Sequence, residues 1–256
     1  MIKESSKFTD GLIFEGMTSI SAVINSPSSN DRKISKVIYD AGKEKSKFKE
    51  LAFLRHKADE LGFSLLPSTS SEIDSLTIGN SHGGIIAICE ERTIPRLDIS
   101  YIKRDGFYVM LEGIEDPYNF GYSLRSLYAA GVDGVILNER NWMGAAGVVA
   151  RASAGASEML QMLIASGEDA AETFKKLGYK IICAGIRNSV SIYDADMKKP
   201  VFLIIGGEKR GISSSVLKHA DQIVRIDYDS KFKGSLSAAS SAAIIGFEIM
   251  HQNKIM

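Results

Sequence analysis

The sequence lacks long apolar runs and has only two cysteines among its 256 residues. No apolar run reaches the roughly 18 residues that a membrane-spanning helix needs, so we expect no membrane span. Residues 1–12 contain no apolar signal-peptide core, and we therefore expect a cytoplasmic protein. Cys89 and Cys183 form no CxxC pair, which predicts two reduced core thiols instead of a disulfide framework.

Metal ligands, hydrolytic residues and common nucleotide-binding loops are also missing. The four histidines are scattered without ligand spacing and no Ser–His–Asp pattern is present, so we predict no metal site and no hydrolytic activity. The absence of G-x-G-x-x-G argues against a Rossmann dinucleotide site. The loop GGEKRGIS, residues 206–213, has Ile212 where a phosphate-binding loop requires lysine, which excludes a nucleotide triphosphatase.

Net charge is zero, so overall charge does not indicate a nucleic-acid partner, but one segment is basic. Residues 31–57 hold nine Lys and Arg against four acids, a local excess of +5. Clustered cations attract phosphates even on a neutral protein, although a solvated helix face gives the same pattern. The candidates for phosphate contact here are Lys33, Lys36, Lys43, Lys45, Lys47 and Arg55.

Apolar periodicity divides the chain into two α/β regions. A polar stretch at 91–106 contains Pro95 and lacks periodicity, so we place the linker there and predict domains at 1–98 and 105–256. In the second domain apolar strands alternate with helices, which predicts a mostly parallel sheet covered on both faces. The first domain is expected to have helices at 17–26, 47–62 and 70–76, and strands at 34–40, 63–68 and 83–90. The second is expected to have strands at 107–113, 133–138, 179–185, 201–207 and 222–227, and helices at 120–131, 145–154, 168–178 and 236–250.

Three segments of the second domain suggest one composite site. An apolar strand ends in Gly206 and Gly207, which gives either a tight turn or a backbone cradle for an adenosine moiety. In DPYNFGYSLR, residues 116–125, Arg125 is expected near a helix N-terminus. There it opposes the helix dipole and requires a phosphate or a salt bridge. The small residues of SLSAASSAA, 235–243, allow close packing beneath a loop or at a dimer seam. Lys231 and Lys233, just upstream, are free to reach a polyanion.

Taken in this order, the three segments resemble the SpoU, or TrmH-like, branch of the SPOUT RNA methyltransferases. The family motifs D-P-x-N-x-G-x-x-x-R, G-x-E-x-x-G and S-L-N-V-S correspond to DPYNFGYSLR, GGEKRG and SLSAA. ARASAGASE, residues 150–158, is similar to a further family segment, and the resemblance covers roughly 105–252. The N-terminal region, ending in SHGGIIAI at 81–88, looks like a ribosomal-protein-like substrate-binding domain.

The resemblance implies an S-adenosylmethionine-dependent transfer of a methyl group to a ribose 2′-hydroxyl of rRNA or tRNA. It implies a deep C-terminal trefoil knot that builds the cofactor site, and a homodimer with the site near the subunit interface. Residues 1–98 would be a smaller α/β domain that binds structured RNA, and 105–256 the SPOUT methyltransferase domain. The lysines at 231 and 233 and those of the basic segment would then contact RNA.

By motif position, the resemblance assigns catalytic or substrate-positioning roles to Asn119, Arg125, Glu208, Ser235 and Ser237. Arg125 would bind the adjacent phosphate and stabilise the developing alkoxide, and Glu208 would orient Arg125 or Asn119. Cofactor binding is assigned to Gly206, Gly207, Gly211, Ile226, Ser235 and Leu236. Ser237 and Ala239 replace the Asn and Ser of the third motif. The alternative is therefore a catalytically impaired RNA-binding paralogue that retains the fold.

Overall fold

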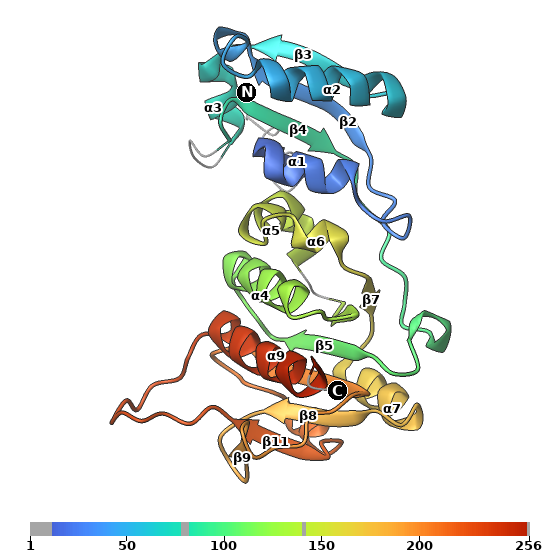
Figure 1. Ribbon diagram of the computed structural model, residues 1–256, viewed down its shortest axis with the longest axis vertical. Helices are drawn as coiled ribbons and strands as arrows, with labels where there is room; N and C mark the ends of the chain where they lie inside the picture. Colours follow the sequence, from blue (N-terminus) through green and yellow to red (C-terminus); the bar gives the residue numbers. More distant parts are fainter. Residues whose placement is uncertain (1–11, 78–81, 140–141, 255–256) are drawn as a thin grey trace, which may run out of the picture. The chain divides into compact units, whose positions relative to one another are not determined.

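The computed structural model describes residues 12–77, 82–139 and 142–254 (Figure 1). The chain divides into two compact units: Met1–Thr93 with Trp142–Met159, and Ile94–Asn141 with Leu160–Met256. The chain thus leaves the second unit after Asn141 and returns to it at Leu160.

The second unit contains a seven-stranded sheet with strand order β7-β6-β5-β10-β8-β11-β9. Every neighbouring pair is parallel, which confirms the mostly parallel sheet. Both faces of a parallel sheet are covered, so its strands consist of nearly continuous apolar residues. The strands are β5 (Phe107–Glu112), β6 (Gly134–Leu137), β7 (Met162–Ile164), β8 (Lys180–Ala184), β9 (Val190–Ser191), β10 (Val201–Gly206) and β11 (Gln222–Arg225).

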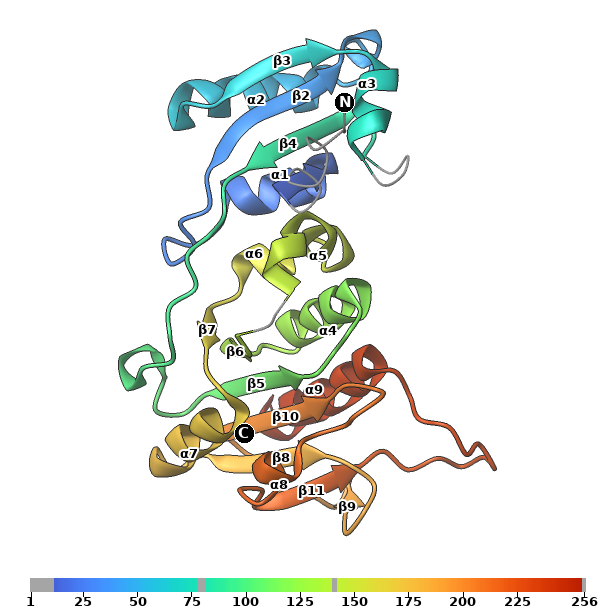
Figure 2. The same cartoon turned by 180° about the vertical axis from the view of Figure 1, so that it is seen from behind.

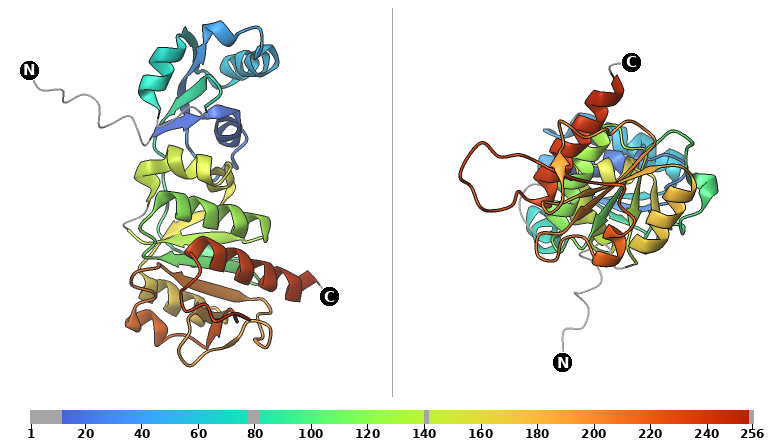
Figure 3. Two further views of the ribbon diagram at one scale, coloured as in Figure 1. Left: turned by 90° about the vertical axis from the view of Figure 1, so that its left-hand side faces the viewer. Right: turned by 90° about the horizontal axis from the view of Figure 1, so that it is seen from below.

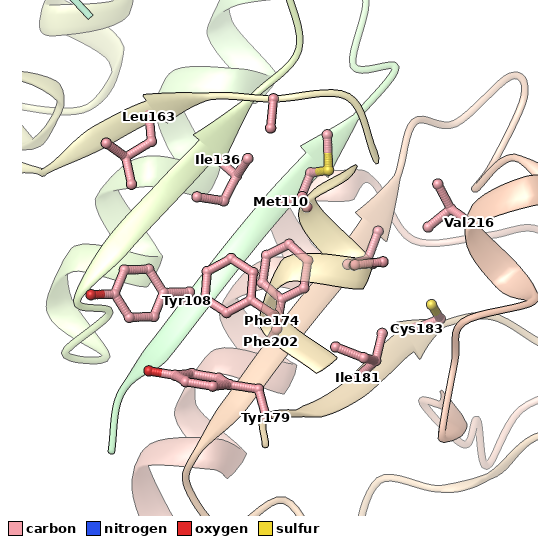
Figure 4. Packing of buried hydrophobic residues seen from close by; sticks show 14 residues of the cluster. Tyr108, Met110, Ile136, Leu163, Phe174, Tyr179, Ile181, Cys183, Phe202 and Val216 are labelled. Carbon is pink, nitrogen blue, oxygen red and sulfur yellow. The ribbon is translucent and has the colours of Figure 1, made fainter. Parts of the chain in front are cut away.

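Helices α4 (Pro117–Ala129) and α9 (Ala238–Lys254) cover one face of this sheet, and α7 (Gly167–Lys176) and α8 (Ser214–Leu217) cover the other (Figures 1 and 2). Between the sheet and α7, the ring of Phe174 stacks on Phe202 with centroids 4.1 Å apart (Figure 4). Tyr108 and Tyr179 complete this buried aromatic group. The stack fixes α7 against the middle of the sheet.

The neighbouring strands β5 and β10 mark the point where the connections diverge. The helix after β5 is α4, and the helix after β10 is α8, on the opposite face (Figure 2). In open parallel sheets, ligands bind at the carboxyl ends of the strands where such a divergence opens a crevice. The loops that follow Glu112 and Gly206 therefore frame the expected site.

The first unit has a four-stranded sheet, order β1-β4-β2-β3, in which only β2 and β3 pair in parallel. Gly62 ends α2 with a φ of 78°, as its glycine predicted, and Thr69 and Glu72 form the capping box of α3. Its strands are β1 (Ile13–Glu15), β2 (Ile34–Asp40), β3 (Ser64–Ser68) and β4 (Ile85–Cys89). Its helices are α1 (Gly16–Ile24), α2 (Phe48–Leu61), α3 (Ser70–Leu76), α5 (Ala146–Ala152) and α6 (Ala156–Met159).

A buried ion pair ties α6 to the first unit. Arg32 Nε lies 2.9 Å from Glu158 Oε2, and both side chains are almost completely buried. Asn30 Nδ2 donates to the same carboxylate oxygen at 2.8 Å. The predicted domain ranges 1–98 and 105–256 stay predictions, but these contacts group residues 142–159 with the first unit and not with the second.

Candidate functional site

Two glycine-containing loops meet at the carboxyl ends of β5 and β10. The Gly207 N–H donates to the Glu112 carbonyl at 2.6 Å, and a Cβ at Gly207 would lie 2.0 Å from the Gly113 carbonyl oxygen. A Cβ at Gly206 would lie 2.3 Å from the carbonyl carbon of Gly211, whose φ is 65°. Any larger residue would force these backbones apart, so the two glycines of the second motif permit a close contact between the loops.

Helix α4 begins earlier than the sequence interpretation placed it. The Asp116 carboxylate accepts hydrogen bonds from the N–H groups of Tyr118 and Asn119, and Pro117 occupies the first helical position. Asn119 therefore lies in the first turn of the helix. The expectation that Arg125 lies near the helix N-terminus was wrong, because the Asp-Pro pair starts α4 at 117 and puts Arg125 in its third turn.

The Arg125 side chain is exposed and has no hydrogen bond or ion pair to any residue that the structure describes. The surface salt bridge considered for it is thus not formed within this part of the chain. A guanidinium in this state offers five donors to an external anion such as phosphate.

Glu208 connects all three motifs through one carboxylate oxygen. Oε1 accepts a hydrogen bond from Asn119 Nδ2 at 3.1 Å and from the Ala238 N–H, at the start of α9, at 3.3 Å. A second link joins the same loops, because Lys209 Nζ lies 2.6 Å from Glu115 Oε2. Of the two partners expected for Glu208, the structure shows Asn119 and not Arg125. No signal in the sequence predicted the contact between Lys209 and Glu115.

Ser237 acts as the N-cap of α9. Its Oγ accepts from the Ser240 N–H at 3.1 Å, and its carbonyl oxygen accepts from the Ser241 N–H at 2.9 Å. Asparagine and serine are about equally good N-caps, so Ser237 can replace the family asparagine in this role. The sequence interpretation treated Ser237 as a catalytic candidate and missed its capping function, for which the following helix-forming alanines were a signal.

A cavity of about 240 Å³ opens between the motif loops and is bounded by Asn119, Glu208 and Ala238 together with residues 113–116 and Lys209. Its lining combines an amide, carboxylates and backbone groups, which suits a hydroxyl-bearing ligand. Arg125 and Ser235 are not among the residues that line it.

Of the residues expected to hold the cofactor, Gly206 and Gly207 stand at the carboxyl end of β10 and Ile226 at that of β11, two strands that flank β8, whereas Ser235 and Leu236 lie in the segment between β11 and α9. Ile226 directly follows β11, and the Leu236 N–H donates to the Tyr228 hydroxyl at 3.1 Å. The side chains of Ile226 and Leu236 are half-buried, whereas Ser235 is exposed. An adenosyl group needs apolar contacts and few polar partners, which half-buried apolar side chains such as Ile226 and Leu236 can supply.

The basic residues fall into paired and unpaired groups. In the first unit Lys43, Lys47 and Arg55 form ion pairs with Asp40, Glu50 and Glu44. Lys33, Lys36 and Lys45 form none with the described residues, and the same holds for Lys231 and Lys233 in the second unit. The paired cations lose part of their attraction for phosphate, so the basic segment is weaker than its charge count suggested.

The described part of the chain has neither a metal-binding cluster nor a membrane-spanning helix. Within 12–77, 82–139 and 142–254, no group of three or more His, Cys, Asp or Glu side chains is placed to hold a metal ion. In the same residues no helix has both the length and the apolar character needed to cross a bilayer.

Comparisons with known proteins agree with the motifs. The chain is 25% identical over 244 residues to the 23S rRNA (guanosine-2′-O-)-methyltransferase RlmB of Xylella fastidiosa, covering 93% of this chain and 96% of that protein. A solved RNA 2′-O ribose methyltransferase matches the fold with a TM-score of 0.77 and 21% identity, covering 100% of this chain and 93% of that one. An AdoMet-bound rRNA methyltransferase from Sinorhizobium meliloti matches with a TM-score of 0.71 and 22% identity, covering 95% and 88%.

The model of the SpoU rRNA Methylase family matches residues 106–247, a range that contains all three motifs and the loops joined by Glu208. This range is more than half of the chain. The protein therefore belongs to the SpoU rRNA Methylase family.

Proposed function

We propose that the protein transfers a methyl group from S-adenosylmethionine to a ribose 2′-hydroxyl of RNA, either rRNA or tRNA. The observation that carries this proposal is the carboxylate of Glu208, which joins Asn119 of the first motif to Ala238 of the third. Three segments far apart in the sequence thereby form one site in a family of RNA methylases. The relative named as a 23S rRNA 2′-O-methyltransferase, which aligns over nearly its full length, supports the same reaction.

The cofactor supplies a methyl group bound to a positively charged sulfur. Gly206, Gly207 and Gly211 would place backbone groups against its adenosyl part, with Ile226 and Leu236 as apolar walls and Ser235 at the edge. The AdoMet-bound state of a protein with the same fold supports this use of the site. The residues of this chain then need only bind the cofactor and the RNA, align the 2′-hydroxyl with the methyl group, and exclude water.

The cavity beside Glu208 would receive the target ribose. Asn119, held by Glu208, orients the 2′-hydroxyl, and Arg125 binds the adjacent phosphate and stabilises negative charge that develops on the oxygen. A guanidinium stays protonated in proteins, so Arg125 is not assigned the role of base. The ribose oxygen would take the methyl group from the bound cofactor in exchange for its proton, which would leave to water, and Asn119 and Arg125 would hold that oxygen in place.

The proposal includes a homodimer and a trefoil knot in the second unit. Helices α4 and α9 pack together and expose Tyr122, Tyr128 and Phe247, each more than two-fifths accessible. Large aromatic side chains exposed on two helices that pack together support a second copy of this chain as the partner. Strands β10 and β11 flank β8 in the sheet, an order compatible with a knot built around the loops of the cofactor site.

The first unit is proposed to bind structured RNA in the cytoplasm, through Lys33, Lys36 and Lys45 and, more weakly, the ion-paired Lys43, Lys47 and Arg55. Lys231 and Lys233 would add contacts next to the catalytic site. Contacts of this kind position RNA by its backbone and shape without reading its sequence.

The catalytically impaired paralogue has no support. The argument for such a paralogue was that Ser237 replaces the asparagine of the third motif, but Ser237 caps α9 as an asparagine would. Asn119, Arg125 and Glu208 are all present, and two of them are in contact.

Incubation with tritiated S-adenosylmethionine and separated rRNA and tRNA fractions tests the function. The wild-type protein should label one fraction in an alkali-resistant dinucleotide, which marks a 2′-O-methyl group. Arg125→Ala should abolish labelling while calorimetry shows an unchanged affinity for the cofactor. Labelling of base atoms by the wild-type protein, or full activity of Arg125→Ala, would contradict the respective assignment.

A further inference from the structure

The segment 226–237 connects β11 to α9 and extends away from both elements (Figures 1 and 3). We call this segment the arm. It contains no helix or strand, but several of its residues contact one another. The rings of Tyr228 and Phe232 pack with centroids 5.8 Å apart, and the Tyr228 hydroxyl accepts the Leu236 N–H at 3.1 Å. A Cβ at Gly234 would come within 2.5 Å of the Phe232 ring, so this ring lies directly against the glycine.

The ring held in this way faces solvent. Phe232 is 57% exposed and Tyr228 is 39% exposed. A single exposed aromatic residue is ordinary on a protein surface, but here internal contacts organise two of them in a segment without secondary structure. A ring that is already held in place loses little conformational entropy when it binds, which favours a binding role.

The charges around the ring match a polyanion. Lys231 and Lys233 flank Phe232 in the sequence, are exposed, and form no ion pair with any residue that the structure describes. Of the two acids in the arm, Asp227 is paired with Arg225 at 2.7 Å, which leaves Asp229 against the two lysines. An aromatic ring between two cations is the arrangement that binds single-stranded nucleic acid, because the ring stacks on a base while the cations meet phosphates.

The arm also ends at the catalytic site. Its last residue, Ser237, precedes Ala238, whose N–H is bonded to Glu208. Phe232 and Ala238 are six positions apart in the sequence, and an extended chain of that length spans at most about 22 Å. A base stacked on Phe232 therefore belongs to a nucleotide within a few positions of the ribose in the Glu208 cavity.

We propose that the arm is a stacking platform for an unpaired base of the substrate RNA. Phe232 takes the base, Tyr228 and Gly234 hold the ring, and Lys231 and Lys233 bind the flanking phosphates. The identity of the ligand as substrate RNA rests on the proposed function. Stacking on a ring tolerates every base, so the arm contributes affinity and alignment and does not select sequence.

Binding of a fluorescein-labelled, mixed-sequence single-stranded RNA of about 12 nucleotides tests the platform by fluorescence anisotropy. Phe232→Ala should weaken binding about 5- to 100-fold, Phe232→Leu nearly as much, and Phe232→Trp should restore it. Tyr193→Ala is the matched control, because Tyr193 is 66% exposed in the same unit, and it should bind as the wild type does. Lys231→Ala with Lys233→Ala should make the slope of log K against log salt less negative by about 1.4.

A methyl-transfer assay distinguishes a failure of the stacking platform from a failure of the proposed function on which it rests. With RNA as the varied substrate, Phe232→Ala should raise KM while kcat and the calorimetric affinity for S-adenosylmethionine stay unchanged. If the wild type transfers methyl groups and Phe232→Ala binds RNA equally well, the platform is refuted and the function stands. Loss of cofactor affinity or of self-association in Phe232→Ala, without loss of RNA binding, also refutes it. Binding of RNA that depends on Phe232 in a wild type without transferase activity refutes the function instead.

Discussion

The N-cap of α9 offers the sharpest test of how this chain departs from its family. Ser237 Oγ accepts the Ser240 N–H, and Glu208 accepts the Ala238 N–H, so two of the four free N–H groups at the start of the helix are satisfied by side chains. Replacing Ser237 with alanine removes the first acceptor. Because Ser240 is exposed, water can take its place, and we expect a cost of about 1 kcal/mol in the free energy of unfolding.

In a chain of this size, 1 kcal/mol corresponds to a melting temperature lower by about 2–4 °C. Ser237→Asn, which restores the family residue, should melt within about 1 °C of the wild type and keep full methyl transfer, since both residues cap equally well. Ser240→Ala is the control, because it removes the 3.0 Å contact between the two hydroxyls but leaves the capped N–H in place. Differential scanning calorimetry measures all three variants. A wild-type melting temperature for Ser237→Ala, or an equal loss in Ser237→Asn, would refute the capping argument.

Three further predictions concern the same unit and the buried thiols. Glu208→Ala should lower methyl transfer by a factor of about 100 or more, because Asn119 loses the carboxylate that holds it. The melting temperature should fall by only a few degrees. Wild-type activity of this variant would contradict the role of Glu208 in holding Asn119. Gly207→Ala should destabilise the protein by about 1–3 kcal/mol, since its Cβ meets backbone at 2.0 Å, whereas Gly185→Ala meets only a side-chain methyl at 3.1 Å and should cost less in the same melting assay. Burial raises the pKa of the Cys89 and Cys183 thiols to about 12, so both stay protonated at pH 8 and should react with Ellman's reagent only after unfolding.

Most regular elements were predictable because their signals are local. The strand at 34–40 and the helix at 70–76 have the predicted bounds, and Gly62 ends α2 as its position indicated. Among the elements missed are β1, β7, β9, α6 and α8, none longer than four residues. Such short elements contain too few residues for apolar periodicity to appear, and the surrounding fold determines them.

The candidate site, too, was predictable only where its signals are local in the sequence. The sequence motifs identified Asn119 and Glu208, but their contact spans 89 positions and depends on which strands become neighbours in the sheet. The position of Arg125 in α4 was misjudged although a local signal existed, since Asp116 followed by Pro117 is a helix start. The ion pairs of Lys43, Lys47 and Arg55 were not predictable from charge counts, because these depend on the rotamers and the spacing of the folded surface.

The buried pair of Arg32 and Glu158 limits how this protein can be cut into working parts. A fragment that ends at residue 98 would keep Arg32 and discard Glu158, leaving a guanidinium without its carboxylate in an apolar interior. The complementary fragment would carry α5 and α6 without the strand and helix on which they pack. A folded fragment of the first unit must therefore combine 12–93 with a grafted 142–159, and any exchange of this unit between relatives must transplant both pieces together.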